Sequence, residues 1–223
     1  MKKSIKSDIV LWIVIFLPLV YLAYLWSGLP DSVPVHWNFQ GEVDRYGSKA
    51  ELLILTFLPL IMYFLFIIIP KIDPKNRLKN MGGKYSGFRS VMIVFMSALA
   101  IMMIYTAKHE IFPGNNLMFI LMGGLFTMLG NYFKTLKANY FIGIKTPWTL
   151  ESETVWNDTH KLGGKLWFAG GFLIILSGIF TPPEVNSVVF GVILAIMVLV
   201  PVVYSYFRFE KLKKDKKETG INS

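Results

Sequence analysis

The Lys and Arg residues of this 223-residue chain are concentrated in every second gap between six long apolar runs. These runs contain no charged residue and cover residues 9–27, 52–69, 90–107, 117–133, 166–181 and 185–207. An α-helix needs about 20 mostly apolar residues to cross the hydrocarbon core of a bilayer. The sequence therefore predicts six transmembrane helices.

The uneven charge distribution also predicts the orientation of the chain. Lys and Arg number 3 in the N-terminal arm, 6 between the second and third runs, 5 between the fourth and fifth, and 6 in the tail, whereas the other gaps hold 2, 1 and 0. Cytoplasmic loops of membrane proteins carry such an excess. We therefore expect an all-α polytopic membrane protein with six transmembrane helices and cytoplasmic N- and C-termini.

Composition narrows the possible partners. The chain is 54% hydrophobic and carries a net charge of +9, but its basic residues are spread over four stretches next to the membrane. Binding to nucleic acid requires basic residues gathered on one face of a module, so the lipid bilayer is the expected partner and nucleic acid is not. The chain has no cysteine, which excludes disulfides and cysteine-based metal sites. We expect no cofactor.

The chain is expected to divide into four parts. Residues 8–70 form an N-terminal two-helix membrane domain with an exported loop, and residues 71–110 form a basic cytoplasmic loop and the third helix. Residues 111–207 form a three-helix domain, and residues 208–223 form a basic cytoplasmic tail.

The exported loop contains an outer motif, residues 34–49, that is rich in polar and aromatic groups. Residues 35–39 alternate apolar and polar side chains, which predicts a short extended stretch, and Gly41 and residues 44–47 are expected to form turns. One interpretation is a recognition surface at the headgroup level, and the other is a structured cap. The binding candidates are His36, Trp37, Asn38, Gly41, Asp44 and Lys49. No ligand spacing typical of a zinc or calcium site is present, so we expect no metal.

The end of the fourth run and the gap that follows it contain an inner motif, residues 131–134 and 139–160. Pro147 predicts a helix that begins at or after it, and Thr149 is the expected N-cap. The helix that follows is amphipathic and carries Trp148 and Trp156, so we expect it to lie flat on the inner membrane surface. Glu153 and the histidine at 160 are two turns apart, about 10 Å of rise, too far for a direct acid–base pair. We therefore expect no catalytic residues and no enzyme activity.

Small residues recur in the fifth run. The pairs at 163/164, 170/171 and 177/178 are spaced by seven residues, which predicts one seam of close helix packing. A second small face, at positions 123, 124, 127 and 130, is available in the fourth run. Pro18, Pro59 and Pro201 lie inside runs, where neighbouring helices must satisfy the carbonyls that proline leaves without a donor.

Transport is an alternative function. No Asp, Glu, Lys, Arg or His lies in the middle of a run, which disfavours proton-coupled pumps. A small-solute or peptide transporter lined by polar groups such as Asn131 and Ser205 remains open. A membrane enzyme using His36, Glu42 and Asp44 is a third and weaker hypothesis.

The inner motif resembles the signature of the SdpI family, membrane proteins that give a bacterium immunity to its own sporulation-delaying toxin. The resemblance is carried by Gly130-Asn131, Asn139, the block Gly143-Ile144-Lys145-Thr146-Pro147-Trp148-Thr149-Leu150, Glu153, Val155-Trp156 and Thr159-His160. The family usually has Arg at the position of Lys145. The outer motif, with Pro34, His36-Trp37-Asn38, Gly41, Asp44 and Ser48-Lys49, is similar to an uncharacterised domain often fused in front of that module.

The resemblance implies a multi-pass protein of the bacterial cell membrane that confers resistance to a secreted antimicrobial peptide. Some members of the family also act as receptors that hold a cytoplasmic repressor at the membrane. On this basis the outer motif is the expected binding site for a peptide toxin. The expected docking residues for a cytoplasmic repressor are Asn131, Asn139, Gly143, Lys145, Thr146, Pro147, Trp148, Thr149, Glu153, Trp156 and His160.

Overall fold

The computed structural model describes residues 5–38, 43–74, 76–109 and 114–218. Within these residues, six helices are long and apolar enough to cross a membrane. They are α1 (Ile5–Leu25), α2 (Glu51–Ile72), α3 (Gly83–His109), α4 (Gly114–Phe133), α6 (Glu153–Phe180) and α7 (Pro183–Glu218). Each covers all or nearly all of one of the six predicted runs, which confirms the all-α polytopic fold.

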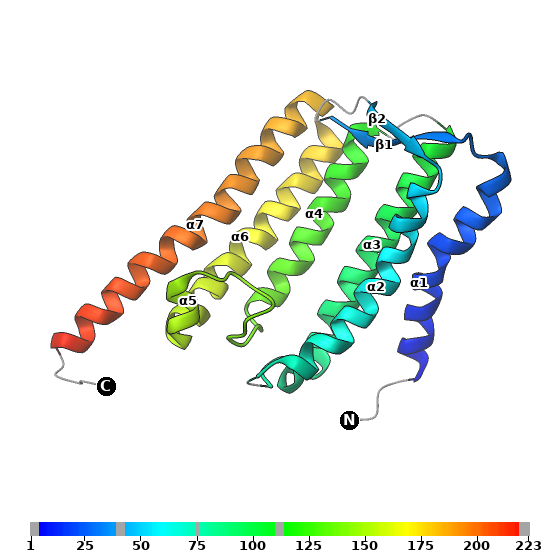
Figure 1. Ribbon diagram of the computed structural model, residues 1–223. Helices are drawn as coiled ribbons and strands as arrows, with labels where there is room; N and C mark the ends of the chain where they lie inside the picture. Colours follow the sequence, from blue (N-terminus) through cyan, green and yellow to red (C-terminus); the bar gives the residue numbers. More distant parts are fainter. Residues whose placement is uncertain (1–4, 39–42, 75, 110–113, 219–223) are drawn as a thin grey trace.

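Five shorter elements complete the described structure. They are the 3₁₀ turns η1 (Trp26–Gly28) and η2 (Lys79–Met81), the strands β1 (Ser32–Trp37) and β2 (Val43–Ser48), and helix α5 (Pro147–Glu151). The strands form a two-stranded antiparallel sheet. Figure 1 shows this hairpin at one end of the bundle and α5 at the other. We refer to these as the hairpin end and the α5 end.

The spanning helices pack as two groups of three. Helices α1, α2 and α3 contact one another, α6 packs between α4 and α7, and a smaller α3–α4 contact joins the groups. Helix α1 begins, and α7 ends, at the α5 end (Figure 1). The outer motif follows the first spanning helix and the inner motif follows the fourth, so the two motifs lie at opposite ends of the bundle.

Helices α4 and α6 approach closely because glycines face one another. A Cβ atom at Gly164 would lie 2.9 Å from the carbonyl oxygen of Gly130, and one at Gly171 would lie 2.6 Å from that of Gly123. Small residues permit such backbone contact in a membrane, where dispersion rather than the hydrophobic effect holds helices together. The packing role predicted for the small faces of α4 and α6 is confirmed.

The prediction of a single seam on α6 is wrong, because each glycine pair is divided between two neighbouring segments. Gly164 and Gly171 face α4, whereas a Cβ at Gly163 would meet Ile144 and one at Gly170 would meet α7 at Met197. Adjacent residues on a helix point about 100° apart, so a pair repeated every seven residues forms two parallel seams. One seam holds α4, and the other holds the inner motif and α7.

At two of the prolines inside the spanning helices, Pro70 and Pro201, a neighbouring helix donates to the carbonyl oxygen that the proline leaves without a helical donor. Pro201 in α7 cannot bond the carbonyl of Met197, which instead accepts from Trp167 Nε1 of α6 at 3.0 Å. Pro70 lies in the last turn of α2, beyond the predicted run, and frees the carbonyl of Phe66. This oxygen accepts from the Tyr85 hydroxyl of α3 at 2.8 Å.

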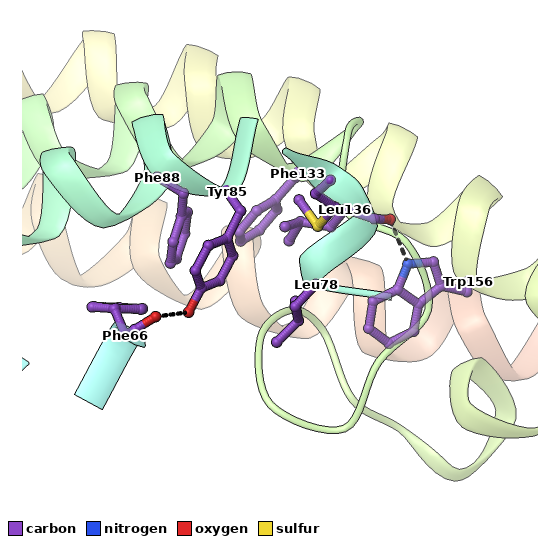
Figure 2. Close-up of a cluster of buried hydrophobic side chains, with 8 residues drawn as sticks. Phe66, Leu78, Tyr85, Phe88, Phe133, Leu136 and Trp156 are labelled. Atoms are coloured by element: carbon purple, nitrogen blue, oxygen red, sulfur yellow. Dashed lines mark hydrogen bonds between the residues drawn. The ribbon is translucent and has the colours of Figure 1, made fainter. Parts of the chain in front are cut away.

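A buried cluster at the α5 end joins the two groups of helices. It contains residues from α2, η2, α3, α4 and α6, together with the connections beside them: Phe66, Leu78, Met81, Tyr85, Phe88, Phe133, Leu136 and Trp156. Figure 2 shows Tyr85 pointing to the carbonyl oxygen of Phe66 and the indole nitrogen of Trp156 pointing to that of Leu136. The inner motif is thus anchored in the core that holds the two groups together.

Candidate functional site

At the hairpin end, β1 and β2 cover the ends of the helices with one face. Val33 is fully buried among Leu22 of α1, Leu52 of α2, and Ile104 and Ala107 of α3. Tyr46 of β2 is exposed, whereas its cross-strand partner Pro34 is buried. The extended stretch predicted at residues 35–39 is confirmed for residues 35–37, where β1 ends, and residue 39 lies outside the described residues.

The turn predicted at residues 44–47 is wrong, because these residues form most of β2 and pair with β1. Asp and Gly favour turns locally, but the pairing with a neighbouring strand overrides that preference. Among the candidates, Gly41 lies outside the described residues. Trp37 lies in β1 opposite Val43, and Asn38 follows the strand, half-buried.

The structure brings the polar candidates of the hairpin together in pairs. His36 Nδ1 lies 2.6 Å from Asp44 Oδ1, with both side chains exposed. Lys49 binds the carboxylate of Asp31 at 2.8 Å and lies over the ring of Trp26 at the base of the hairpin. The hydrogen bond from Lys49, together with its charge, lowers the pKa of Asp31.

At the α5 end, Asn139 shapes the loop of the inner motif. Its side-chain oxygen accepts from the backbone N–H groups of Phe141 at 2.8 Å and Ile142 at 2.7 Å. Its amide nitrogen donates to the carbonyls of Lys137 at 2.8 Å and Ile142 at 2.9 Å. Asn139 is 3% exposed, so this single side chain satisfies a buried turn of backbone from within.

His160 continues the same internal hydrogen bonding. Its Nδ1 bonds the carbonyl of Trp156 at 2.8 Å, and its Nε2 accepts from the backbone N–H of Ile144 at 2.9 Å. These partners define a neutral imidazole with the proton on Nδ1. Both ring nitrogens are therefore committed to the backbone, and the group is 1% exposed.

Trp156 is fully buried and stacks on His160, with ring centroids 4.0 Å apart. Its Nε1 donates to the carbonyl of Leu136 at 2.8 Å. The backbone of Gly143 crosses these two rings with φ +121°, and a Cβ there would lie 2.5 Å from His160 Nε2. A glycine is required here both by the backbone conformation and by the close approach.

The short helix α5 begins with a cap that differs from the predicted one. Thr146, not Thr149, is the N-cap, because Pro147 occupies the first helical position, where its missing N–H costs nothing. The Thr146 hydroxyl accepts from Thr149 N at 3.2 Å, and the Thr149 hydroxyl accepts from Thr146 N at 2.9 Å. The two threonines form a reciprocal capping box.

The prediction of one amphipathic helix on the membrane surface is also wrong. Ser152 leaves the helical conformation and caps a second helix, α6, which runs on into the bundle. Val155 and Trp156 are fully buried in protein rather than immersed in headgroups. The apolar stripe reflects packing against the neighbouring helices, which an isolated helical projection cannot distinguish from membrane contact.

Helix α5 is held against α7. The Thr146 hydroxyl bonds the fully buried Ser205 at 3.0 Å, and the ring of Trp148 contacts that of Tyr206 edge-on at 5.1 Å. Exposed Lys145 donates to the carbonyls of Tyr140 at 3.2 Å and Phe141 at 3.3 Å. Ser205, which the sequence offers as a pore-lining group, is instead buried between α5 and α7.

Two candidates behave differently from the rest. Asn131 is exposed on α4, outside this network. Glu153 is paired across the bundle, with its carboxylate bound by Arg77 through contacts of 2.7 and 3.2 Å. The sequence did not predict the role of Arg77, because this residue is 76 positions away from Glu153 and no local pattern indicates that the two are in contact.

Among the described residues there is no group of three His, Cys, Asp or Glu side chains able to hold a metal ion.

Comparisons with known proteins find matches to two segments of the chain. Residues 135–205 match the SdpI/YfhL protein family, and residues 13–63 match a domain of unknown function, DUF1648. Most of the inner motif thus lies in the segment that is similar to the SdpI/YfhL family. The "Immunity protein SdpI" of Bacillus subtilis (strain 168) is 24% identical over 209 residues, which are 93% of this chain and 98% of that protein.

A second relative shares a shorter segment. An uncharacterized protein of Archaeoglobus fulgidus is 41% identical over 63 residues, which are 25% of this chain and 34% of that protein. No solved structure matches the chain. The six apolar helices and the similarity to SdpI along almost the whole chain identify a multi-pass protein of the cell membrane.

Proposed function

We propose that this protein is a membrane immunity protein that gives resistance to a secreted antimicrobial peptide. The observation that carries the proposal is the similarity to Immunity protein SdpI, which extends over 93% of this chain and 98% of that protein. Similarity of this extent includes both ends of the bundle, where the outer and inner motifs lie. The charge distribution supports a cytoplasmic α5 end.

The hairpin is the proposed binding site for the peptide. Val33 anchors the hairpin in the cluster at the helix ends, so the exposed side chains of the hairpin are held in place there. The hairpin exposes the imidazole–carboxylate pair of His36 and Asp44. Arg45, which is paired with Glu51, and Tyr46 are exposed on the neighbouring positions of β2. Aromatic and charged groups side by side suit a peptide that is itself partly apolar and partly charged.

The inner motif is the proposed docking site for a cytoplasmic repressor. Its residues fall into a buried scaffold, which includes Asn139, Thr149 and His160, and an exposed remainder. The exposed side chains are those available to a partner, and among them Tyr140 is 50% and Leu150 is 41% exposed. Exposed apolar groups on a rigid support are typical of a protein-binding surface.

Expression in a peptide-sensitive host tests immunity directly. Cells that make the protein should survive a secreted antimicrobial peptide that kills cells carrying an empty vector. Asp44→Asn, which changes the exposed pair without removing a buried group, should reduce protection at equal protein level. Unchanged killing across a panel of such peptides would defeat the proposal. Peptide or solute flux through reconstituted vesicles, without protection by binding, would instead support the transporter.

A matched pair of variants separates docking from scaffolding. Leu150→Ser changes only an exposed side chain, so it should weaken repressor recruitment and leave thermal stability unchanged. Thr149→Val removes the buried hydroxyl of the capping box and should lower stability by about 1–3 kcal/mol, the usual cost of unsatisfied buried groups. If Leu150→Ser keeps full recruitment, α5 is not the docking surface.

A further inference from the structure

Arg77 binds the inner motif from a distant part of the chain. It lies in the connection between α2 and α3, outside the segments that match the two families. Its guanidinium holds both carboxylate oxygens of Glu153, a bidentate arrangement that fixes direction as well as distance. The hydrogen bonds to Glu153 raise the pKa of Arg77 above its ordinary value.

The loop that carries Arg77 is built to present it. Asp73 is 3% exposed, and its carboxylate accepts from the backbone N–H of Leu78 at 2.9 Å. Asn76 takes a left-handed conformation, with φ 50°, which reverses the chain immediately before the arginine. Leu78, the next residue, is fully buried in the cluster that also contains Trp156. Arg77 is thus anchored on both sides.

Glu153 stands at a sensitive point of the inner motif. It is the first residue of α6 and follows Ser152, the residue at which α5 and α6 change direction. Two residues later, Val155 is fully buried. A displacement of the Glu153 carboxylate would therefore move the turn between α5 and α6 and change the orientation of α5.

Helix α2 links this ion pair to the hairpin. At its first residue, Glu51 binds Arg45 of β2 at 3.0 Å. The same helix then continues to Ile72, one residue before the loop that holds Arg77. One continuous helix thus has an ion pair with the outer motif at its first residue and leads to the loop whose Arg77 has an ion pair with the inner motif.

We propose that Arg77 is a positioning residue of the inner motif, which couples the hairpin to the α5–α6 turn through α2 and Glu153. This proposal rests on the proposed function in one respect only: the event that the coupling would transmit is the binding of a peptide at the hairpin. The bundle offers a matched control, because Arg208 of α7 binds Asp158 of α6 at the same 2.7 Å separation but joins two helices of one group.

The test measures how often the α5–α6 turn opens. The chain has no cysteine, so Val155→Cys introduces a single buried thiol whose reaction with a maleimide reports opening. In this background, Arg77→Glu and Glu153→Arg should each speed labelling about fivefold, which corresponds to about 1 kcal/mol, the upper range for a partly exposed ion pair. The double reversal should return the rate to that of the Val155→Cys parent.

The control reversals Arg208→Glu and Asp158→Arg should leave this labelling rate unchanged. Equal rates in the parent and in the two single reversals, or a double reversal as fast as the singles, would overturn the positioning role. If Arg77→Glu does not yield folded protein, Arg77→Gln provides the same comparison without a repelling charge.

The coupling is tested by adding the peptide that gives protection. It should change the labelling rate of Val155→Cys in the parent and in Arg208→Gln, but not in Arg77→Gln. A response that persists in Arg77→Gln overturns the coupling. If no peptide is protective, the proposed immunity function fails, while the labelling rates without peptide still decide the positioning role.

Discussion

Replacing Gly143 by alanine tests whether the inner motif is as rigid as its contacts indicate. The new Cβ would lie 2.5 Å from His160 Nε2 and 3.0 Å from the nearest ring carbon of Trp156. Neither ring can move away without loss, because Trp156 donates to Leu136 and His160 bonds the backbone through both nitrogens. The substitution must therefore displace the loop.

The expected cost is the sum of two contributions. A residue with a side chain held at a strongly positive φ costs about 1–3 kcal/mol, and Gly143 has φ +121°. Displacing the loop weakens the hydrogen bond from Ile144 to His160, which contributes about 0.5–1.5 kcal/mol. We expect Gly143→Ala to destabilise the protein by about 1.5–4.5 kcal/mol.

Thermal unfolding in detergent, followed by tryptophan fluorescence, measures this effect. Gly124→Ala is the matched control, because a Cβ at that position on α4 would have no atom within 4 Å. Alanine also favours a helix over glycine by about 0.5–1 kcal/mol, so the control should unfold at or above the parent temperature. Equal unfolding temperatures for Gly143→Ala and Gly124→Ala would refute the rigid arrangement of loop and rings.

Three further predictions address the bundle. Trp167→Phe and Tyr85→Phe each remove the donor to a carbonyl that a proline leaves unpaired, so each should lower the free energy of unfolding in detergent by about 1–3 kcal/mol. Gly171→Leu should separate α4 from α6 and lower the unfolding temperature, whereas Gly191→Leu, which has open space around it, should not. Asp31→Asn should lower stability near neutral pH and not in acid. The pKa of Asp31 is lowered in the folded state, so its contribution is lost as the pH falls through that lowered value.

The six helices were predictable because the bilayer imposes a length and a polarity on each of them. Their ends were not. Helix α3 begins at Gly83, seven residues before its apolar run, and α7 continues to Glu218, well beyond Phe207. Hydropathy reports where the chain is surrounded by lipid, whereas a helix ends where its backbone hydrogen bonds end.

The errors at the two motifs have local and long-range causes. The cap at Thr146 follows from the preference of proline for the first helical position, so the sequence contained that signal. The strand at Val43–Ser48 and the contact of Arg77 with Glu153 depend on partners supplied by the tertiary structure. No local pattern encodes them, because the residues involved suit turns and exposed loops equally well.

The inner motif was interpreted from sequence as a surface for a partner, yet most of its polar atoms are used within the motif itself. Asn139 makes four hydrogen bonds to its own loop, and both nitrogens of His160 bond the backbone. Such residues determine the conformation of the loop, and a partner would contact the side chains that this conformation exposes, such as Tyr140 and Leu150. Loss of function on changing Asn139 or His160 therefore reports the scaffold, whereas loss of function at unchanged stability on changing Leu150 reports the contact.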